Sequence, residues 1–80
     1  MDNGIVFPNP ATDKIYIELE DKTTYVYYAT IFDNVGRTKY MLPKPDAQDG
    51  INISTLKPGY YFITIRDSKG KSTTKKFIKL

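Results

Sequence analysis

Carboxylates are the first candidates for chemistry in this 80-residue chain, because it contains neither histidine nor cysteine. No Ser-His or Cys-His nucleophile can therefore be assembled. Two pairs of acids lie close in sequence, Glu18 with Glu20 and Asp46 with Asp49, whereas glycoside hydrolysis needs two carboxylates facing each other across a cleft. The first pair falls on the exposed face of a strand pattern and the second in a Pro-rich stretch. The sequence therefore predicts that the protein is not an enzyme.

Metal binding has one weak candidate. Asp46, Asp49 and the carbonyl of Gly50 could donate oxygens to Ca²⁺, which takes about six to eight such ligands. Their spacing matches no calcium-binding loop, and without cysteine or histidine there is no structural zinc site. We therefore expect an ordinary polar loop and no cofactor.

Two-residue periodicity predicts strands along most of the chain. In Lys14–Leu19 the alternation places Ile15, Ile17 and Leu19 on one face. Thr24–Phe32 is apolar on both faces, which indicates a central strand that is covered on both sides or lies beside a partner. Strict alternation sets Tyr25, Tyr27, Ala29 and Ile31 against Val26, Tyr28, Thr30 and Phe32.

Turn residues divide the rest of the chain. Asp33–Gly36 predicts a hairpin turn before a short strand, Arg37–Leu42, and two prolines make Pro43–Gly50 a surface loop. Alternation then returns at Gly50–Ser54, and Leu56 is expected in the core. The remaining expected elements are a short strand at Gly4–Phe7 and a terminal hairpin that pairs Tyr60–Arg66 with Ser72–Lys79 across Asp67–Gly70. About seven strands with regularly spaced turns predict a β-sandwich.

A single domain fits residues 1–80, with Met1 to Gly4 as linker or cloning residues. A chain this short buries only roughly 60% of its unfolded surface, so its core is thin. No run of 18 or more apolar residues exists and the first residues do not resemble a signal peptide, so we expect no membrane span.

Positive charge is concentrated at the end of the chain. From Lys57 onward seven cations accompany one acid, whereas residues 1–56 carry five cations and eight acids. These lysines either form the solvated face and protected edge of a terminal strand, or meet an acidic receptor surface or anionic lipid headgroups. No RNP-like motif or glycine-rich phosphate cradle is present, so no nucleic acid partner is expected.

Four segments resemble, in order and spacing, the type A C-terminal sorting domains of the type IX (Por) secretion system of Bacteroidetes. The similarity extends from Val6 to Leu80, and the segments are Val6–Asp13, Ala29–Arg37, Ile51–Phe62 and Lys75–Lys79. The resemblance implies an all-β, immunoglobulin-like antiparallel sandwich of about seven strands.

The resemblance also implies a function. Such domains follow an N-terminal cargo domain in the parent chain, and direct it from the periplasm through the outer-membrane translocon to the cell surface or the extracellular space. A sortase-like peptidase commonly removes the domain and links the cargo to anionic lipopolysaccharide. The domain would thus be a substrate and an address.

Two groups of residues become candidates on this basis. A boundary between cargo and domain is expected at Phe7, Pro8, Asn9 and Pro10, since prolines fix the backbone of an extended segment. Partner recognition is expected at Gly36, Arg37, Gly59, Tyr60, Lys75, Lys76, Lys79 and Leu80. The chain departs from the family's Leu-Thr-Gly-Arg type of turn at Asn34–Tyr40, which weakens the transfer of a role to Arg37.

Other functions remain open. A binding or adhesion module of the fibronectin or carbohydrate-binding type would expose an aromatic platform, for which Tyr16, Tyr27 or Tyr28, and Tyr60 are the candidates. The same tyrosines could instead widen a shallow core. A spacer domain would show neither activity. We expect a monomer or a weak edge-strand dimer, and the lysines of the last strand disfavour the dimer.

Overall fold

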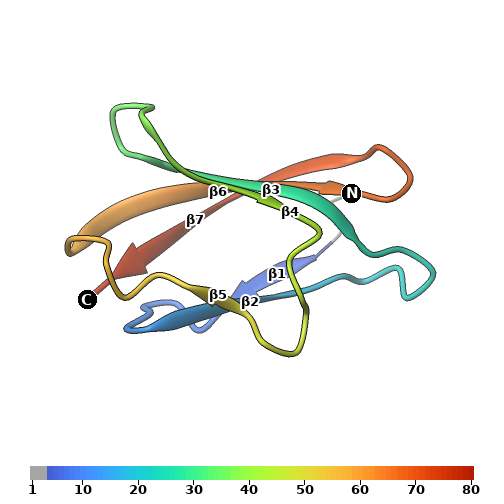
Figure 1. The fold of residues 1–80 in the computed structure, drawn as a ribbon, viewed down its shortest axis with the longest axis horizontal. Helices are drawn as coiled ribbons and strands as arrows, with labels where there is room; N and C mark the ends of the chain where they lie inside the picture. The colour runs from blue at the N-terminus through green and yellow to red at the C-terminus, as the bar shows by residue number, and fades with distance from the viewer. Residues whose placement is uncertain (1–3) are drawn as a thin grey trace.

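Two antiparallel sheets pack face to face in the computed structural model, which describes residues 4–80 (Figure 1). The expectation of a linker at Met1 to Asn3 lies outside this range. The three-stranded sheet has the order β1-β2-β5 and consists of Ile5–Phe7, Lys14–Glu18 and Ile51–Asn52. The four-stranded sheet has the order β4-β3-β6-β7 and consists of Thr38–Pro43, Val26–Asp33, Gly59–Asp67 and Ser72–Lys79.

The topology is that of an immunoglobulin-like sandwich. The first, second and fifth strands share one sheet, while the third, sixth and seventh share the other, as strands A, B, E and C, F, G do in that fold. Here β4 extends the second sheet beside β3. The all-β sandwich predicted from the sequence is confirmed. Residues 4–80 contain no helix that could cross a membrane.

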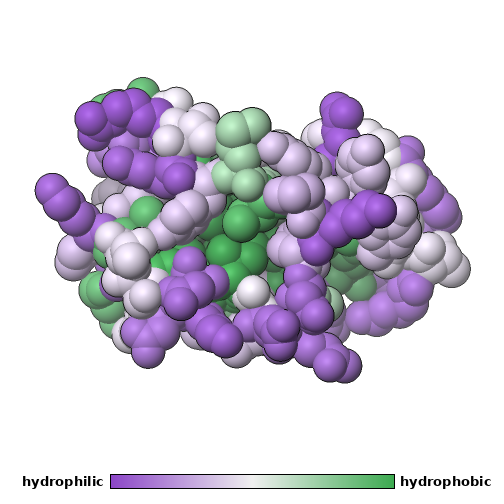
Figure 2. Space-filling model, viewed as in Figure 1, coloured by the Kyte–Doolittle hydropathy of each residue, from purple (hydrophilic) through white to green (hydrophobic). Residues whose placement is uncertain are grey.

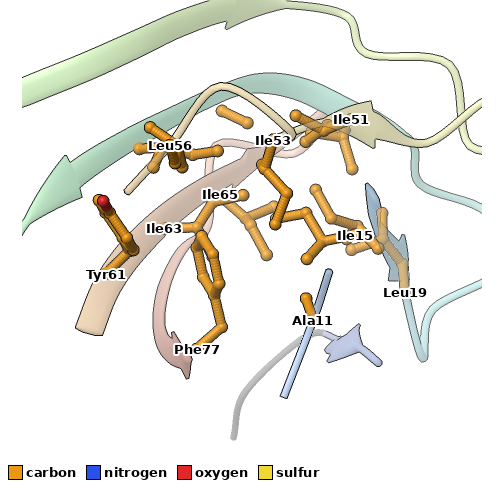
Figure 3. Packing of buried hydrophobic residues seen from close by; sticks show 14 residues of the cluster. Ala11, Ile15, Leu19, Ile51, Ile53, Leu56, Tyr61, Ile63, Ile65 and Phe77 are labelled. Carbon is orange, nitrogen blue, oxygen red and sulfur yellow. The ribbon is translucent and has the colours of Figure 1, made fainter. Parts of the chain in front are cut away.

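The core lies between the sheets and is formed by the inward residues of each strand (Figure 3). Ile15, Ile17 and Leu19 are buried, as the alternation predicted, and Leu56 lies in the core, as expected. Phe77 is fully buried and stacks on Tyr61, with ring centroids 5.7 Å apart. The complete cluster is Ala11, Ile15, Ile17, Leu19, Val26, Ala29, Ile31, Ile51, Ile53, Leu56, Tyr61, Ile63, Ile65 and Phe77.

The central strand β3 departs from strict alternation. Its register against β6 shifts between Val26 and Tyr28, so Val26 is buried in the same core as Ala29 and Ile31. The prediction that Val26 lies on the opposite face was therefore wrong, because a β-bulge inserts an extra residue. The outer face of β3 is only half buried, and Phe32 there stacks on Phe62 of β6.

One side of the sandwich is open. Tyr40 and Leu42 of β4 and Ile51 of β5 line a hollow of about 330 Å³ between the sheets. Figure 2 shows apolar atoms at the surface in the middle of this side. The outer edges of β4 and β5 thus leave part of the core accessible.

Two hairpin turns of the larger sheet have the same construction. In Asp33–Arg37 and in Asp67–Lys71 the glycine N–H donates to the aspartate carbonyl, and the aspartate N–H donates to the carbonyl four residues later. The φ angles of Gly36 and Gly70 are +87° and +86°, in the left-handed region that glycine adopts without strain. Both turns were predicted and are confirmed.

Residues 9–11 bind the outer edge of β7. The Asn9 side chain accepts from the N–H of Ile78 at 2.9 Å and donates to the Lys76 carbonyl at 3.3 Å. Ala11 donates from its N–H to the Ile78 carbonyl at 2.7 Å and accepts from the Leu80 N–H at 2.8 Å. Because residue 11 leads into β2, these bonds connect the two sheets.

The folded part of the domain begins before this segment. β1 precedes Pro8 and pairs with β2. Gly4 is buried at a φ of +133°, and a Cβ there would lie 2.9 Å from the Glu18 carbonyl oxygen. Gly4 therefore packs against the sheet, directly before β1, in the region where the sequence pattern predicted a short strand at Gly4–Phe7.

Replacing Asn9 by alanine is expected to lower the unfolding free energy by about 1–2 kcal/mol, because two β7 backbone groups lose their partner. Asn9→Asp should lose less, since a carboxylate oxygen still accepts from Ile78. Chemical denaturation measures both, with the exposed loop variant Gln48→Ala as the control. Equal stability of the alanine variant and the parent would contradict this role.

Tyr61 has a second role besides packing. Its hydroxyl donates to the Lys57 carbonyl at 2.6 Å, which is the tyrosine corner of immunoglobulin-like domains at the start of strand F. Tyr61→Phe should therefore cost about 1 kcal/mol of stability. The neighbouring exposed Tyr60→Phe is the matched control and should be neutral in the same denaturation experiment.

Candidate functional site

A hollow of about 500 Å³ lies at one end of the sandwich, where the β3–β4 turn meets the chain between β5 and β6. Arg37, Gly59 and Tyr60, three of the predicted recognition residues, line it, and Gly36 precedes Arg37 in the turn. The full lining is Asp33, Asn34, Arg37, Lys39, Tyr40, Thr55, Leu56, Lys57, Pro58, Gly59, Tyr60 and Tyr61.

Asp33 organises the turn side of this hollow. Its carboxylate accepts from the backbone N–H groups of Val35 at 3.1 Å and Arg37 at 2.8 Å, and from the Arg37 guanidinium Nε at 2.8 Å. The Lys39 ammonium lies 4.0 Å away. Burial of Asp33 disfavours its charged form, but these hydrogen bonds outweigh burial and lower the pKa of Asp33 below 3.8.

The opposite wall is fixed by side chains that bind the connecting chain. The Tyr61 hydroxyl holds the Lys57 carbonyl, and the Tyr40 hydroxyl of β4 bonds with the Thr55 hydroxyl. Gly59 begins β6 at a φ of +150°, which carries the chain from this wall into the sheet. Both walls of the hollow are therefore held in place by hydrogen bonds.

The lysines of β7 alternate between two faces. Lys76 points outward, with its ammonium 4.2 Å from the centroid of the Tyr60 ring, a cation–π distance. Lys75 and Lys79 share the inward face with buried Phe77. Lys79 is only 9% exposed and donates to the Leu80 carbonyl at 2.9 Å, while the Leu80 side chain is exposed.

The predicted recognition residues thus gather around one end, although unequally. Gly59 pairs with Lys79 and Tyr60 with Ile78, so the start of β6 and the end of β7 lie beside the hollow. Lys75 pairs with Ile63 further along the sheet and is half buried. The surface that Lys76, Tyr60 and Leu80 expose is therefore more accessible than Lys75 and Lys79.

The tyrosines do not form one platform. Tyr16 stacks on Phe7 at 5.7 Å, and the Tyr60 ring lies beside Lys76. Tyr27 is exposed at the bulge of β3, which pairs with the far end of β6 from Tyr60. The arrangement gives no support to the aromatic platform that a carbohydrate-binding module would need.

The carboxylates considered as catalytic or metal-binding candidates already have hydrogen-bond or ion-pair partners, or lie apart from one another. Asp46 accepts from the backbone N–H groups of Gln48 and Asp49, so it caps its own turn. Glu18 pairs with Lys22 on the surface. Within residues 4–80, no three acidic side chains come together as a group that could hold a metal ion.

The opposite end of the sandwich has its own ion pair. Lys69 of the β6–β7 turn donates to the Asp21 carboxylate at 3.2 Å and to the Thr23 hydroxyl at 3.1 Å. Hydrogen bonds from the Thr23 hydroxyl and backbone N–H, followed by the one from Lys69, lower the pKa of Asp21 from 3.8 to about 2. This end lies beside the start of β1, since Ile5 pairs with Glu18.

Sequence reasoning did not assign nine of the twelve lining residues to a site, among them Asp33, Lys39, Lys57 and Tyr61. A signal for Asp33 was present, because Asp-x-x-Gly followed by a cation occurs twice, at Asp33–Arg37 and Asp67–Lys71. A tyrosine at the start of the sixth strand was likewise a signal for the corner at Tyr61. Lys39 and Lys57 carry no local signal, because only the tertiary fold brings them together.

The family model for the secretion system C-terminal sorting domain matches residues 5–80. The chain therefore belongs to this family, and the resemblance found in the sequence is confirmed. No curated protein shows a significant match to the chain. Membership makes the domain a sorting signal of type IX secretion, associated with a cargo protein and the secretion machinery and with export to the cell surface or beyond. Members of the family are in general not catalysts.

Acid should destabilise the domain in a defined range. Both Asp21 and Asp33 have a lowered pKa when folded, so their stabilisation is complete above about pH 4 and is lost as the pH falls through the folded value, about 2 for Asp21. The double variant Asp21→Asn, Asp33→Asn should show a flatter decline in unfolding free energy between about pH 4 and pH 2. Denaturant unfolding at several pH values measures it.

The exposed loop variant Asp49→Asn is the control for this experiment, and its acid profile should match that of the parent. An unchanged slope in the double variant would contradict the assignment.

Proposed function

We propose that this domain is the address by which the type IX translocon selects a cargo protein in the periplasm and passes it through the outer membrane. A sortase-like peptidase then removes the domain and attaches the cargo to a surface anchor. Family membership supports the class of function. One observation favours a role as a sorting signal: the start of β1, where cargo would be joined, and the surface proposed for a receptor lie at opposite ends of the sandwich.

The cargo end is defined by β1. In Figure 1 the strand β1 starts on the side of the β6–β7 turn and runs toward the other end of the molecule. Ile5 pairs there with Glu18, near Asp21 and Lys69. A preceding cargo domain would be joined at this end.

The receptor end is the opposite one. Figure 1 shows the C-terminus, the β3–β4 turn and the chain before β6 on the far side from the β6–β7 turn. The hollow, the exposed pair Lys76 and Tyr60, and exposed Leu80 belong to this end. A receptor that binds here can read the domain without contacting the cargo.

We place the boundary between cargo and domain before Ile5 rather than at the prolines. Phe7 to Pro10 lie between two paired strands, and Asn9 binds β7. Cleavage between Ile5 and Pro10 would cut β1 or the segment that closes the edge of β7. A peptidase acting before Ile5 would release an intact domain.

A fusion of residues 5–80 behind a reporter with an ordinary signal peptide tests the proposal. In a host with the secretion system the reporter should reach the cell surface. The double variant Lys76→Gln, Tyr60→Ala should reduce surface reporter roughly fivefold, the effect of losing an interface contact worth about 1 kcal/mol. Export is measured by surface labelling, and folding by thermal denaturation of the purified domain.

Lys71→Gln is the charge-matched control, because Lys71 is exposed in the β6–β7 turn at the cargo end. It should export normally. Deleting the last residues is a poor test, since it removes the buried Phe77, and loss of a core aromatic side chain is expected to destabilise the whole domain. Normal export of a folded Lys76, Tyr60 variant would contradict recognition at this surface, and retention of the parent fusion would contradict the proposed function itself.

A further inference from the structure

The hollow at the receptor end carries an excess of positive charge. Arg37, Lys39 and Lys57 line it together with a single carboxylate, Asp33. That carboxylate is occupied by two backbone N–H groups and the Arg37 Nε. The Lys39 ammonium also lies 4.0 Å from Asp33, so this one carboxylate offsets part of the charge of Arg37 and Lys39. The lining keeps an excess of two positive charges, which can attract a further anion.

The three cationic residues of the hollow are carried by backbone segments that hydrogen bonds hold in place. Arg37 is the closing residue of a hairpin turn whose backbone is bonded to Asp33, and Lys39 follows on β4. Lys57 is anchored at its carbonyl by the tyrosine corner of Tyr61. A site whose backbone is already ordered loses less entropy when it binds a ligand.

The hollow is larger than a single small anion requires. Its volume of about 500 Å³ is within the range of about 300–1,000 Å³ found for ligand pockets. Pro58, Tyr40 and Tyr60 are among the lining residues, and so is Thr55, whose hydroxyl is bonded to that of Tyr40. Room for a side chain and its neighbours favours a peptide over an isolated phosphate group.

We propose that this hollow binds a glutamate or aspartate side chain from an acidic segment of the receptor, with Arg37, Lys39 and Lys57 as its cationic partners. The inference rests on the proposed function, because it names the chemistry of the partner at the same end of the domain. Adjacent apolar residues of the segment would contact Tyr60 and Pro58.

Amide chemical shifts of the isotopically labelled chain test the inference directly. The probe is a blocked peptide that alternates glutamate with leucine, and the reference is the same peptide with glutamine. The glutamate peptide should shift amides within residues 33–39 and 55–61, and the glutamine peptide should not. Lys39→Gln and Lys57→Gln should each weaken binding by up to about fivefold, as expected for the loss of one exposed ion pair.

Arg66→Gln is the control, because Arg66 is exposed on β6 near the other end of the strand. It should leave binding unchanged. Arg37→Gln is a less clean variant, since it also removes the Asp33 contact of the turn. Equal shifts with the glutamine peptide, shifts confined to the outer face of β7, or the absence of shifts would overturn the inference. Stronger and matching shifts with inorganic phosphate would replace it with a phosphate site.

The export assay separates this inference from the proposed function. If the parent fusion reaches the surface and the folded Lys39→Gln, Lys57→Gln variant does so equally well, the hollow is not read by the receptor although the domain is still an address. If the parent fusion is retained, the proposed function fails, and the peptide titration alone decides whether the hollow is an acid-binding site.

Discussion

The hydrogen bonds between residues 9–11 and the end of β7 are the constraint on which the rest of the structure depends. An 80-residue sandwich without cysteine has a thin core and no covalent cross-link between its sheets. Asn9 and Ala11 satisfy backbone groups of Lys76, Ile78 and Leu80 that the edge strand would otherwise leave open. This contact fixes the end of β7 against the first sheet, and with it the position of Phe77 in the core.

Fixing the end of β7 also arranges the end of the sandwich that contains the hollow of about 500 Å³. Lys79 pairs with Gly59, so an anchored β7 holds the start of β6 and the residues that lead into it. The tyrosine corner then fixes Lys57, while the buried Asp33 shapes the turn that carries Arg37. The backbone at Arg37 and Lys57 is thus fixed by Asp33 and Tyr61, and the Asp33 carboxylate also holds the Arg37 guanidinium.

The two-residue alternation of apolar side chains and the residues typical of turns predicted most of the strands and their limits, because both are local properties of the sequence. Ile15, Ile17 and the two Asp-x-x-Gly turns could be assigned from a few neighbouring residues. Val26 could not, since a β-bulge depends on the register with β6. The contact of Asn9 with Ile78 joins residues 69 positions apart, and no pattern in a single sequence shows it. The same is true of Arg37 and Lys57, which line one hollow only when the complete sandwich has formed.

The basic terminal strand serves two purposes on its two faces. Lys75 and Lys79 lie on the same side as Phe77. An inward-pointing charge such as that of Lys75 discourages an edge strand from pairing with another chain, whereas the edge at Lys79 is already bridged by Ala11. Lys76 lies on the other side, beside Tyr60, where a partner can reach it. Alternation therefore gives neighbouring lysines different surroundings, Lys75 on the inward face at the strand edge and Lys76 on the exposed outer face. The positive charge of the sequence divides in this way because successive side chains of a strand point to opposite faces of the sheet.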